Sequence, residues 1–251
     1  MKFLILSDVH GNIEALDAVL ASAPVDSYDR LLVLGDLVGY GANPNEVVDR
    51  IHELEPDALI RGNHDKVSSG IEKPVHFNYV AAEAARWTLE TLTETNRARV
   101  AALPQGPLVV DESIEVCHGT PYDEDAYVFN DDDAVRALDA ASRRLCFFGH
   151  THLPAAFTRT AGDAPLTTLV PELGSSEPTV VALEAQSSYL INPGSVGQPR
   201  DGDPRAAFAT LDLDANEVRI VRVPYRVDVA QQKILDAKLP ESLARRLGIG
   251  R

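Results

Sequence analysis

The most constraining feature of this 251-residue sequence is a series of five short clusters of Asp, Asn and His, each placed directly after an apolar run. The clusters are Asp8-Val9-His10, Gly35-Asp36, Gly62-Asn63-His64-Asp65, His118-Gly119 and Gly149-His150-Thr151-His152. In α/β sheets, binding sites form beyond the carboxyl ends of the strands. If each apolar run is a buried strand, the five clusters meet at one rim of the fold. Such a rim offers carboxylate, amide and imidazole ligands to divalent cations.

The first sixty residues predict alternating strands and helices. Apolar runs at residues 3–6, 31–34 and 58–60 are typical of strands buried on both faces. Between them, Asn12 is expected to cap one helix, and Pro44 lies in the first turn of another. This alternation indicates a parallel sheet with right-handed crossovers.

The remaining residues predict further helices and many short strands. Helices are expected at 79–92, 96–103, 131–140 and 230–247, and strands at 108–110, 114–116, 145–148, 180–183, 189–191, 208–213 and 218–223. Residues 161–178 are rich in Gly, Pro, Ser and Thr, so we expect a loop there. Two mixed sheets packed face to face, with helices outside, account for this order. Because no linker divides the chain, we expect residues 1–251 to form a single domain.

The composition limits the partners of the chain. With 38 acidic and 23 basic residues, the net charge is -15, and such a surface repels nucleic acid and anionic membranes. We therefore expect no stable nucleic-acid binding and no membrane association. Only five of the basic residues are lysines. An acidic, lysine-poor composition suits a high-salt cytoplasm and predicts a halophilic source; chance acidity is the alternative.

Other local features predict a reduced, cytoplasmic protein. Cys117 and Cys146 lie inside apolar runs, so we expect buried thiols and no disulfide. Met1-Lys2 leads straight into the first expected strand, which predicts no signal peptide. No apolar stretch reaches the length that spans a bilayer.

The clusters contain more metal ligands than one ion needs. The candidates are Asp8, His10, Asp36, Asn63, His118, His150 and His152. They fill two sites if one carboxylate is shared. Imidazole and carboxylate ligands suit Mn, Fe, Zn, Co or Ni, whereas calcium prefers oxygen. Two ions ~3.5–4 Å apart can clamp the attacking and leaving oxygens of an in-line displacement, with a metal-bridging hydroxide as the nucleophile.

Each motif taken alone also has a structural interpretation. Asp-x-His pairs are common in solvated loops, and Gly-Asn-His-Asp is compatible with a turn. The Gly-His-Thr-His motif is compatible with a capped strand end. Five such motifs in order, each after an expected strand, favour the functional interpretation.

These five motifs, with residues 35–41 and 192–200, resemble the calcineurin-like metallophosphoesterase superfamily, and especially its small prokaryotic phosphodiesterase-like branch. The resemblance extends to about Ala209. It implies a four-layer α-β-β-α sandwich of two mixed sheets flanked by helices, and hydrolysis of phosphate esters. By position, it implies one metal bound by Asp8, His10, Asp36 and His152, and a second bound by Asp36, Asn63, His118 and His150.

The resemblance also implies contacts with substrate. Asn63 is expected to touch the phosphate as well as a metal. Asn12 resembles a position near the phosphate, but the helix cap is an equally good interpretation. His64 is placed to protonate the leaving oxygen, with Asp65 orienting its imidazole; a surface turn is the alternative. The side chains of Tyr122, Tyr127 and Arg200 are candidates to meet the leaving group, although most exposed tyrosines and arginines have no such role.

We therefore expect a dinuclear enzyme that hydrolyses phosphodiester bonds of a small nucleotide-like substrate, with manganese as the first choice of metal. The alternatives are a phosphomonoesterase acting on a small molecule or phosphoprotein, and a metal-binding scaffold without catalysis. Phosphoprotein phosphatases of the superfamily carry an arginine after the second motif, where this chain has Gly39-Tyr40-Gly41. The presence of His64 and all seven ligand candidates argues against the scaffold. The sequence gives no indication of the oligomeric state. Substrate specificity is expected to depend on loops such as 122–133 and 161–178.

Overall fold

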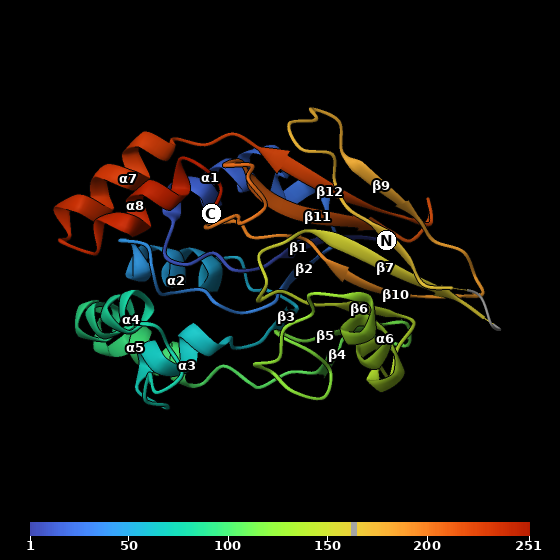
Figure 1. The fold of residues 1–251 in the computed structure, drawn as a ribbon, viewed down its shortest axis with the longest axis horizontal. Coiled ribbons are helices and arrows are strands. Elements are labelled where there is room, and N and C mark those ends of the chain that lie inside the picture. The colour runs from blue at the N-terminus through green and yellow to red at the C-terminus, as the bar shows by residue number, and fades with distance from the viewer. Residues whose placement is uncertain (162–164) are drawn as a thin grey trace.

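Two mixed sheets packed face to face form the centre of the computed structural model, which describes residues 1–161 and 165–251 (Figure 1). Within these residues, one six-stranded sheet has the order β3 (Ala58–Leu59), β2 (Arg30–Val33), β1 (Lys2–Leu6), β11 (Ala206–Asp212), β12 (Glu217–Val223) and β9 (Thr179–Ala182). The other has the order β4 (Leu108–Val109), β5 (Ile114–Val116), β6 (Leu145–Phe147), β10 (Ser187–Asn192), β7 (Ala155–Thr160) and β8 (Thr167–Leu169).

Helices cover the outer faces of both sheets. The α-helices of the described residues are α1 (Ile13–Ser22), α2 (Pro44–Glu53), α3 (Asn63–Ser69), α4 (Tyr79–Thr91), α5 (Glu94–Ala101), α6 (Asp131–Ala140), α7 (Val227–Asp236) and α8 (Glu241–Leu247). Apolar residues of α1 and α2 pack on the first sheet, and those of α6 pack on the second. The four-layer α-β-β-α sandwich expected from the sequence is confirmed.

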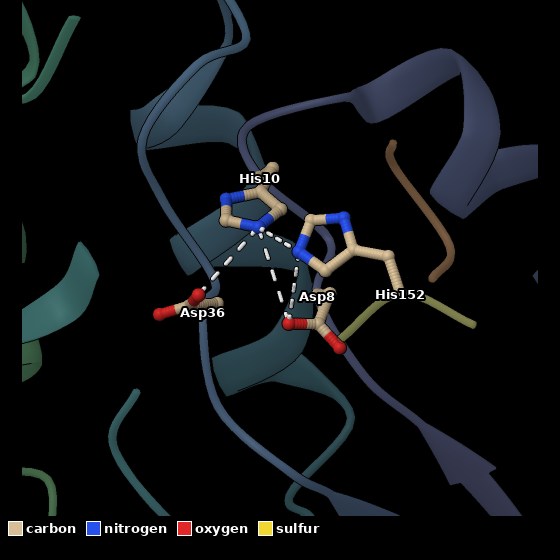
Figure 2. Close-up of side chains that lie close together, drawn as sticks. All are labelled: Asp8, His10, Asp36 and His152. Atoms are coloured by element: carbon tan, nitrogen blue, oxygen red, sulfur yellow. Dashed lines mark hydrogen bonds and ion pairs between the residues drawn. The ribbon is translucent and has the colours of Figure 1, made fainter. Parts of the chain in front are cut away.

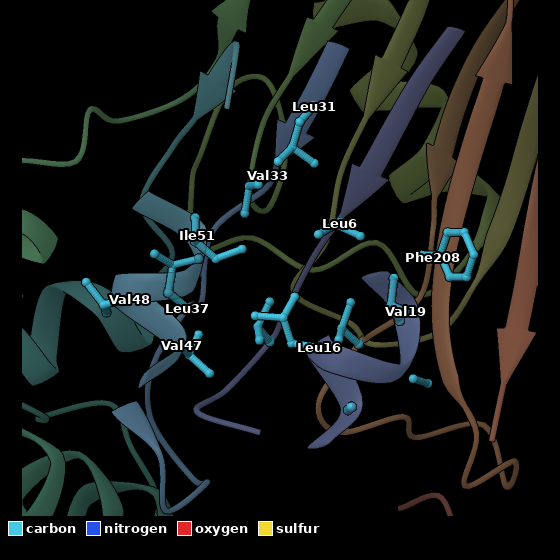
Figure 3. Packing of buried hydrophobic residues seen from close by; sticks show 14 of the residues in the cluster. Leu6, Leu16, Val19, Leu31, Val33, Leu37, Val47, Val48, Ile51 and Phe208 are labelled. Carbon is cyan, nitrogen blue, oxygen red and sulfur yellow. The ribbon is translucent and has the colours of Figure 1, made fainter. Parts of the chain in front are cut away.

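Both faces of strand β1 are buried, each in a different hydrophobic core. Phe3 and Ile5 lie in the core between the sheets, whereas Leu4 and Leu6 lie in the core beneath α1 and α2. Figure 3 shows this helix-side core, where Leu6 lies near Leu16 of α1. Because both faces of β1 are buried, its sequence has no alternation of polar and apolar residues.

Local sequence signals set where several helices begin. The side chain of Asn12 accepts a hydrogen bond from the backbone nitrogen of Ala15 at 3.1 Å, which caps α1 as predicted. Pro44 occupies the first turn of α2, where its missing N–H leaves no bond unmade. The side chain of Asn130 accepts from the backbone nitrogen of Asp133 at 2.9 Å and caps α6. Cys117 and Cys146 are free buried thiols, as predicted.

Several elements differ from the sequence-based predictions, among them the short 3-10 helix at Val25–Ser27. Helix α3 and strand β7 were not predicted. The loop prediction for residues 161–178 is wrong for β8, which pairs with β7 at the edge of its sheet. All three residues of β8 are exposed, so they carry no apolar pattern that would reveal a strand. Residues 162–164 of that loop prediction lie outside the described residues.

No helix in the described ranges is both long enough and apolar enough to cross a membrane. That residues 1–251 form a single domain stays a prediction.

Candidate metal centre

Parallel strand pairs deliver the ligand-bearing loops to one rim. Strand β1 runs parallel to β2, and β5 runs parallel to β6, so their carboxyl ends coincide within each sheet. Backbone hydrogen bonds then join the loops that follow. The nitrogen of Asp8 donates to the carbonyl of Gly35 at 3.1 Å, and the nitrogen of Gly149 donates to the carbonyl of His118 at 2.8 Å. All five predicted clusters therefore meet at this rim.

A first group of ligand atoms comes from four buried residues, Asp8, His10, Asp36 and His152 (Figure 2). One donor atom of each lies within 4.8 Å of the others. The Nε2 atoms of His10 and His152 are 3.0 Å apart, and His152 Nε2 is 3.3 Å from Asp8 Oδ1. Two imidazole nitrogens and two carboxylate oxygens directed at one point form a donor set that fits a divalent transition metal.

A second group lies on the other side of Asp36. His118 Nε2 is 3.4 Å from Asp36 Oδ2 and 3.2 Å from His150 Nδ1. The Oδ1 atom of Asn63 is 3.4 Å from the same His118 nitrogen. The structure thus brings together all seven ligand candidates, in the two groups that the sequence resemblance implies.

Asp36 is the residue that joins the two groups. Its Oδ2 atom lies 3.5 Å from His10 Nε2 in the first group and 3.4 Å from His118 Nε2 in the second. Its Oδ1 atom accepts a hydrogen bond from the backbone nitrogen of His64 at 2.8 Å. Oδ1 is engaged by this bond, and Oδ2 faces both groups, so Asp36 is placed to bridge two ions through one oxygen.

Hydrogen bonds to main-chain carbonyls orient each imidazole. The bonds run from His10 Nδ1 to Val38 at 3.1 Å, from His118 Nδ1 to Leu34 at 2.8 Å, from His152 Nδ1 to Gln198 at 2.6 Å and from His150 Nε2 to Asp125 at 3.0 Å. A ring nitrogen that donates to a carbonyl carries the proton, so the other nitrogen keeps its lone pair. His150 therefore presents Nδ1, whereas the other three rings present Nε2. In the neutral form of each ring, this lone pair faces the two ligand groups.

The ligand residues adopt a backbone conformation that is rare outside glycine. Asp8, His10, Asp36, His150 and His152 have φ between +50° and +66°. Such left-handed residues are strained and concentrate at functional sites, where the surrounding structure holds them in place. Here the strain accompanies five of the seven candidate ligands.

Burial and charge set the protonation of the ligands. Burial lowers the pKa of His150 to about 3 and the pKa values of His10 and His152 well below the usual range, so these rings are neutral and able to bind metal. Burial also opposes a charge on His118, but the Asp36 carboxylate outweighs it and raises the pKa of His118 to about 10. The site thus stabilises positive charge beside Asp36, and a metal ion held by His118 Nε2 would take the place of the proton on that nitrogen.

His64 is buried next to the first group but outside it. Its ring lies 4.9 Å from the ring of His10, 4.3 Å from Tyr40 and 4.6 Å from Phe77. Among the described residues, its Nδ1 atom has no hydrogen-bond partner. Nδ1 packs against Gly39, where an added Cβ would lie 2.5 Å away.

The predicted contact between Asp65 and the imidazole of His64 is wrong. Asp65 Oδ1 accepts from the backbone nitrogen of Val38 at 3.2 Å, and Oδ2 accepts from the backbone nitrogen of Gly62 at 3.0 Å. Asp65 therefore joins the second and third ligand loops. Burial raises the pKa of Asp65 to about 7, and the nearby charge of Asp36 adds to that effect.

The structure favours the cap interpretation of Asn12. Besides capping α1, its Nδ2 donates to the carbonyl of Gly197 at 2.9 Å and to the hydroxyl of Tyr225 at 3.2 Å. Both hydrogens and the oxygen are thus engaged by the protein. Tyr122 lies against Arg136, whose guanidinium carbon is 4.1 Å from its ring centroid.

Sequence reasoning missed the residues that brace the ligand loops. Ser7 Oγ donates to Asp8 Oδ2 at 2.6 Å, and Ser195 Oγ donates to the carbonyl of Asp8 at 2.8 Å. Asn192 Nδ2 donates to the carbonyl of Gly149 at 2.8 Å. Ser195 and Asn192 belong to the 192–200 motif, so its composition was the available signal, but the sequence could not show what these side chains contact.

Comparisons with known proteins agree with this geometry. Residues 1–216 match the model of the calcineurin-like phosphoesterase superfamily domain. The uncharacterized protein MJ0912 of Methanocaldococcus jannaschii is 36% identical over 98% of this chain and 97% of its own length. Phosphodiesterase YfcE of Escherichia coli is 26% identical over 87% of this chain and 91% of its own.

A crystal structure of a metallophosphoesterase from Sphaerobacter thermophilus matches the whole fold. Its TM-score is 0.86 with 37% identity, and the match covers 100% of both chains. The family model, the sequence relatives and this structure all extend over the ligand-bearing loops. This chain belongs to the calcineurin-like phosphoesterase superfamily.

Proposed function

We propose that this protein is a dinuclear metal-dependent phosphodiesterase that acts on a small nucleotide-like substrate. The position of Asp36 carries the proposal, because one carboxylate oxygen faces two separate groups of ligand atoms. YfcE, a 26% identical relative, is a phosphodiesterase by name, and this supports a diester over a monoester as the substrate.

In this proposal, Asp8, His10, Asp36 and His152 bind one divalent ion, and Asp36, Asn63, His118 and His150 bind the other. Bound ions of this kind supply Lewis acidity and a water of lowered pKa at neutral pH. The chain's own contribution is to hold the ligands rigidly, through the carbonyl contacts of each imidazole and the Ser7 contact of Asp8. We propose manganese as the metal, with iron, zinc, cobalt and nickel as alternatives, since imidazole and carboxylate ligands suit all five.

We propose His64 as the general acid. Burial lowers its pKa to about 4, so the ring is neutral in the absence of substrate. An anionic phosphate beside a buried imidazole favours the charged form and raises that pKa. In the substrate complex the ring then takes up a proton from solvent, which it delivers to the leaving oxygen. The unpartnered Nδ1 atom leaves the ring free of a competing acceptor on that side.

The charges near the site favour a diester over a monoester. A phosphodiester carries one negative charge, whereas a monoester dianion needs a further cation. Lys66 and Arg61 are already paired with carboxylates, Lys66 with Asp125 at 2.7 Å and Arg61 with Glu124 at 3.0 Å. Arg200 keeps a monoesterase as the second candidate, because its guanidinium lies against Tyr40 beside the first group and makes no ion pair among the described residues.

Turnover of an aryl phosphodiester and of the matching monoester, each with and without added Mn²⁺, tests the proposal. We expect metal-dependent turnover, with the higher kcat/KM for the diester, and two metal ions per chain by elemental analysis. Asp36→Asn should abolish both activities. His52 is an exposed histidine outside the clusters, so His52→Ala serves as the matched control. Metal-independent turnover, or an active Asp36→Asn variant, would refute the proposal.

A further inference from the structure

The loop of residues 119–129 directly contacts one candidate ligand of the second group. The carbonyl of Asp125 in this loop accepts from His150 Nε2 at 3.0 Å, and Nδ1 of the same ring lies 3.2 Å from His118 Nε2. The ring of Tyr127 stacks on that imidazole, with centroids 3.9 Å apart. The other three candidate histidine ligands donate to carbonyls outside this loop. The orientation of His150 therefore depends on where the loop lies.

A buried lysine anchors the loop to helix α3. Lys66 Nζ lies 2.7 Å from Asp125 Oδ2 and 3.1 Å from Glu124 Oε1, and only 5% of its side chain is exposed. It also lies 3.3 Å from Glu72 Oε2. Arg61 adds two contacts to Glu124, at 3.0 and 3.1 Å. The loop is thus held by charge at Glu124 and at Asp125, the residue whose carbonyl orients the imidazole.

Helix α3 connects the same lysine to a second candidate ligand. Asn63 is the first residue of α3, and Lys66 follows three residues later in this short helix. The Oδ1 atom of Asn63 lies 3.4 Å from His118 Nε2 in the second group. Lys66 therefore joins the helix that carries one candidate ligand to the loop that orients another.

We propose that Lys66 is a positioning residue for the second metal ion, because its ion pairs hold the Asp125 carbonyl where it fixes the imidazole of His150. The inference rests on the proposed dinuclear function and gives a role to a residue that is not itself a ligand. Glu72 and Asp125 form no other ion pair in the described part of the chain. Loss of Lys66 leaves these carboxylates to repel each other, so the loop moves and His150 loses its fixed acceptor.

The sign of the effect distinguishes positioning from simple electrostatics. Lys66→Met makes the surroundings of the second group more negative, which by itself would strengthen the binding of a cation. Asp125→Ala removes a negative charge, which by itself would weaken it. If Lys66 acts by position, both variants weaken the second ion, because each breaks the contact that holds the loop.

Asp125→Asn separates the two effects a second time. It removes the same charge as Asp125→Ala but keeps a side-chain oxygen that accepts from Lys66. Positioning therefore predicts a smaller loss of metal affinity for the asparagine variant than for the alanine variant, whereas electrostatics predicts equal losses. Because 47% of the Asp125 side chain is exposed, these two variants decide the question if Lys66→Met does not fold.

Calorimetric titration of the metal-free protein with Mn²⁺ measures these effects without turnover. Asn63→Ala removes a candidate ligand of the second group alone, so it identifies the binding step of the second ion. We expect Lys66→Met and Asp125→Ala to weaken that step by about 10-fold to 100-fold and to leave the other step nearly unchanged. In the metal-free protein, nitrogen NMR spectra should show His150 protonated at Nε2, and this signal should shift in Lys66→Met.

Arg30→Met is the matched control. Arg30 is a partly buried cation paired with Asp57 at 3.0 Å, and it lies at the start of β2, at the opposite end of that strand from the ligand rim. This variant should lose stability and keep both Mn²⁺ steps and the His150 signal.

Unchanged or tighter binding of the second ion in Lys66→Met, or equal losses in the two Asp125 variants, would overturn the positioning role and leave the dinuclear site standing. If the native protein bound no Mn²⁺ at all, the proposed function would fail, and the positioning role would fail with it.

Discussion

Replacement of Gly62 by alanine tests the bridging position of Asp36 without touching a ligand. The backbone of Gly62 has φ -107° and ψ -179°, an extended conformation that alanine adopts freely. A Cβ at this position would lie 2.1 Å from Asp36 Oδ1, whereas ordinary contacts begin at about 3.4 Å. The substitution must therefore displace the carboxylate or the loop by about 1 Å, well beyond the ~0.2 Å tolerance of metal–ligand distances.

We expect Gly62→Ala to weaken both proposed metal sites, because Asp36 Oδ2 faces both groups of ligand atoms. A 1 Å misplacement costs about 100-fold in rate, so kcat/KM should fall at least that far. Crowding in a packed interior destabilises by about 1–3 kcal/mol, and each kcal/mol lowers Tm by about 2–4 °C in a chain of this size. Elemental analysis after gel filtration, activity with Mn²⁺ and thermal unfolding in chelator measure the three effects separately.

Two further glycines make the test specific. A Cβ at Gly149 would lie 2.0 Å from Ser7 Oγ and 2.7 Å from Asp8 Oδ2, so Gly149→Ala should weaken the ion bound by Asp8 more than the other ion. A Cβ at Gly248 would crowd only the flexible Gln231 side chain, at 3.0 Å, and would make an ordinary contact with the Arg245 carbonyl, so Gly248→Ala is the control. Retention of both ions and of near-normal activity by Gly62→Ala would refute the bridging role of Asp36.

Further predictions concern the acid, the charged loop and the metals. His64→Ala should keep both ions but lose about 10²–10⁴-fold in kcat, more for alkyl than for aryl leaving groups; unchanged kcat would exclude the acid role. Lys66→Met should lower the free energy of unfolding by about 2–3 kcal/mol, as measured by denaturant unfolding. This loss is smaller than for breaking a fully buried ion pair, because the Asp125 side chain is 47% exposed. Burial raises the pKa of Glu124, but Arg61 and Lys66 outweigh burial and lower it below 4.5. The ionised Glu124 carboxylate and its two cations therefore stabilise the fold above about pH 4.5, and this stabilisation is lost as the pH falls further. Glu124→Gln should reduce the fall in unfolding free energy between neutral and acidic pH. Chelation should lower the free energy of unfolding by about 2.7 kcal/mol for each ion held at 100-fold its Kd, and a melting temperature insensitive to chelator and Mn²⁺ would contradict it.

The sequence by itself determined seven ligand candidates and most of the strands that precede them. The run at 3–6 is apolar at every position because β1 is buried on both faces, and a buried run followed by Asp8 and His10 is readable without coordinates. Ligand chemistry is likewise a property of residue type, so seven candidates could be named. Strand β8 was unreadable because its residues are exposed at a sheet edge and carry no periodic signal.

The tertiary structure alone decided how those residues face one another. The sequence resemblance implied that Asp36 is shared, but only the packing of two sheets places its Oδ2 atom between His10 and His118. The same packing turned Asp65 away from His64 and brought Phe77 and Tyr127 to one cavity. Local sequence sets backbone preference and burial over a few residues, whereas these contacts join segments that are distant along the chain. Their geometry depends on strand order and on close packing between layers, which no local pattern encodes.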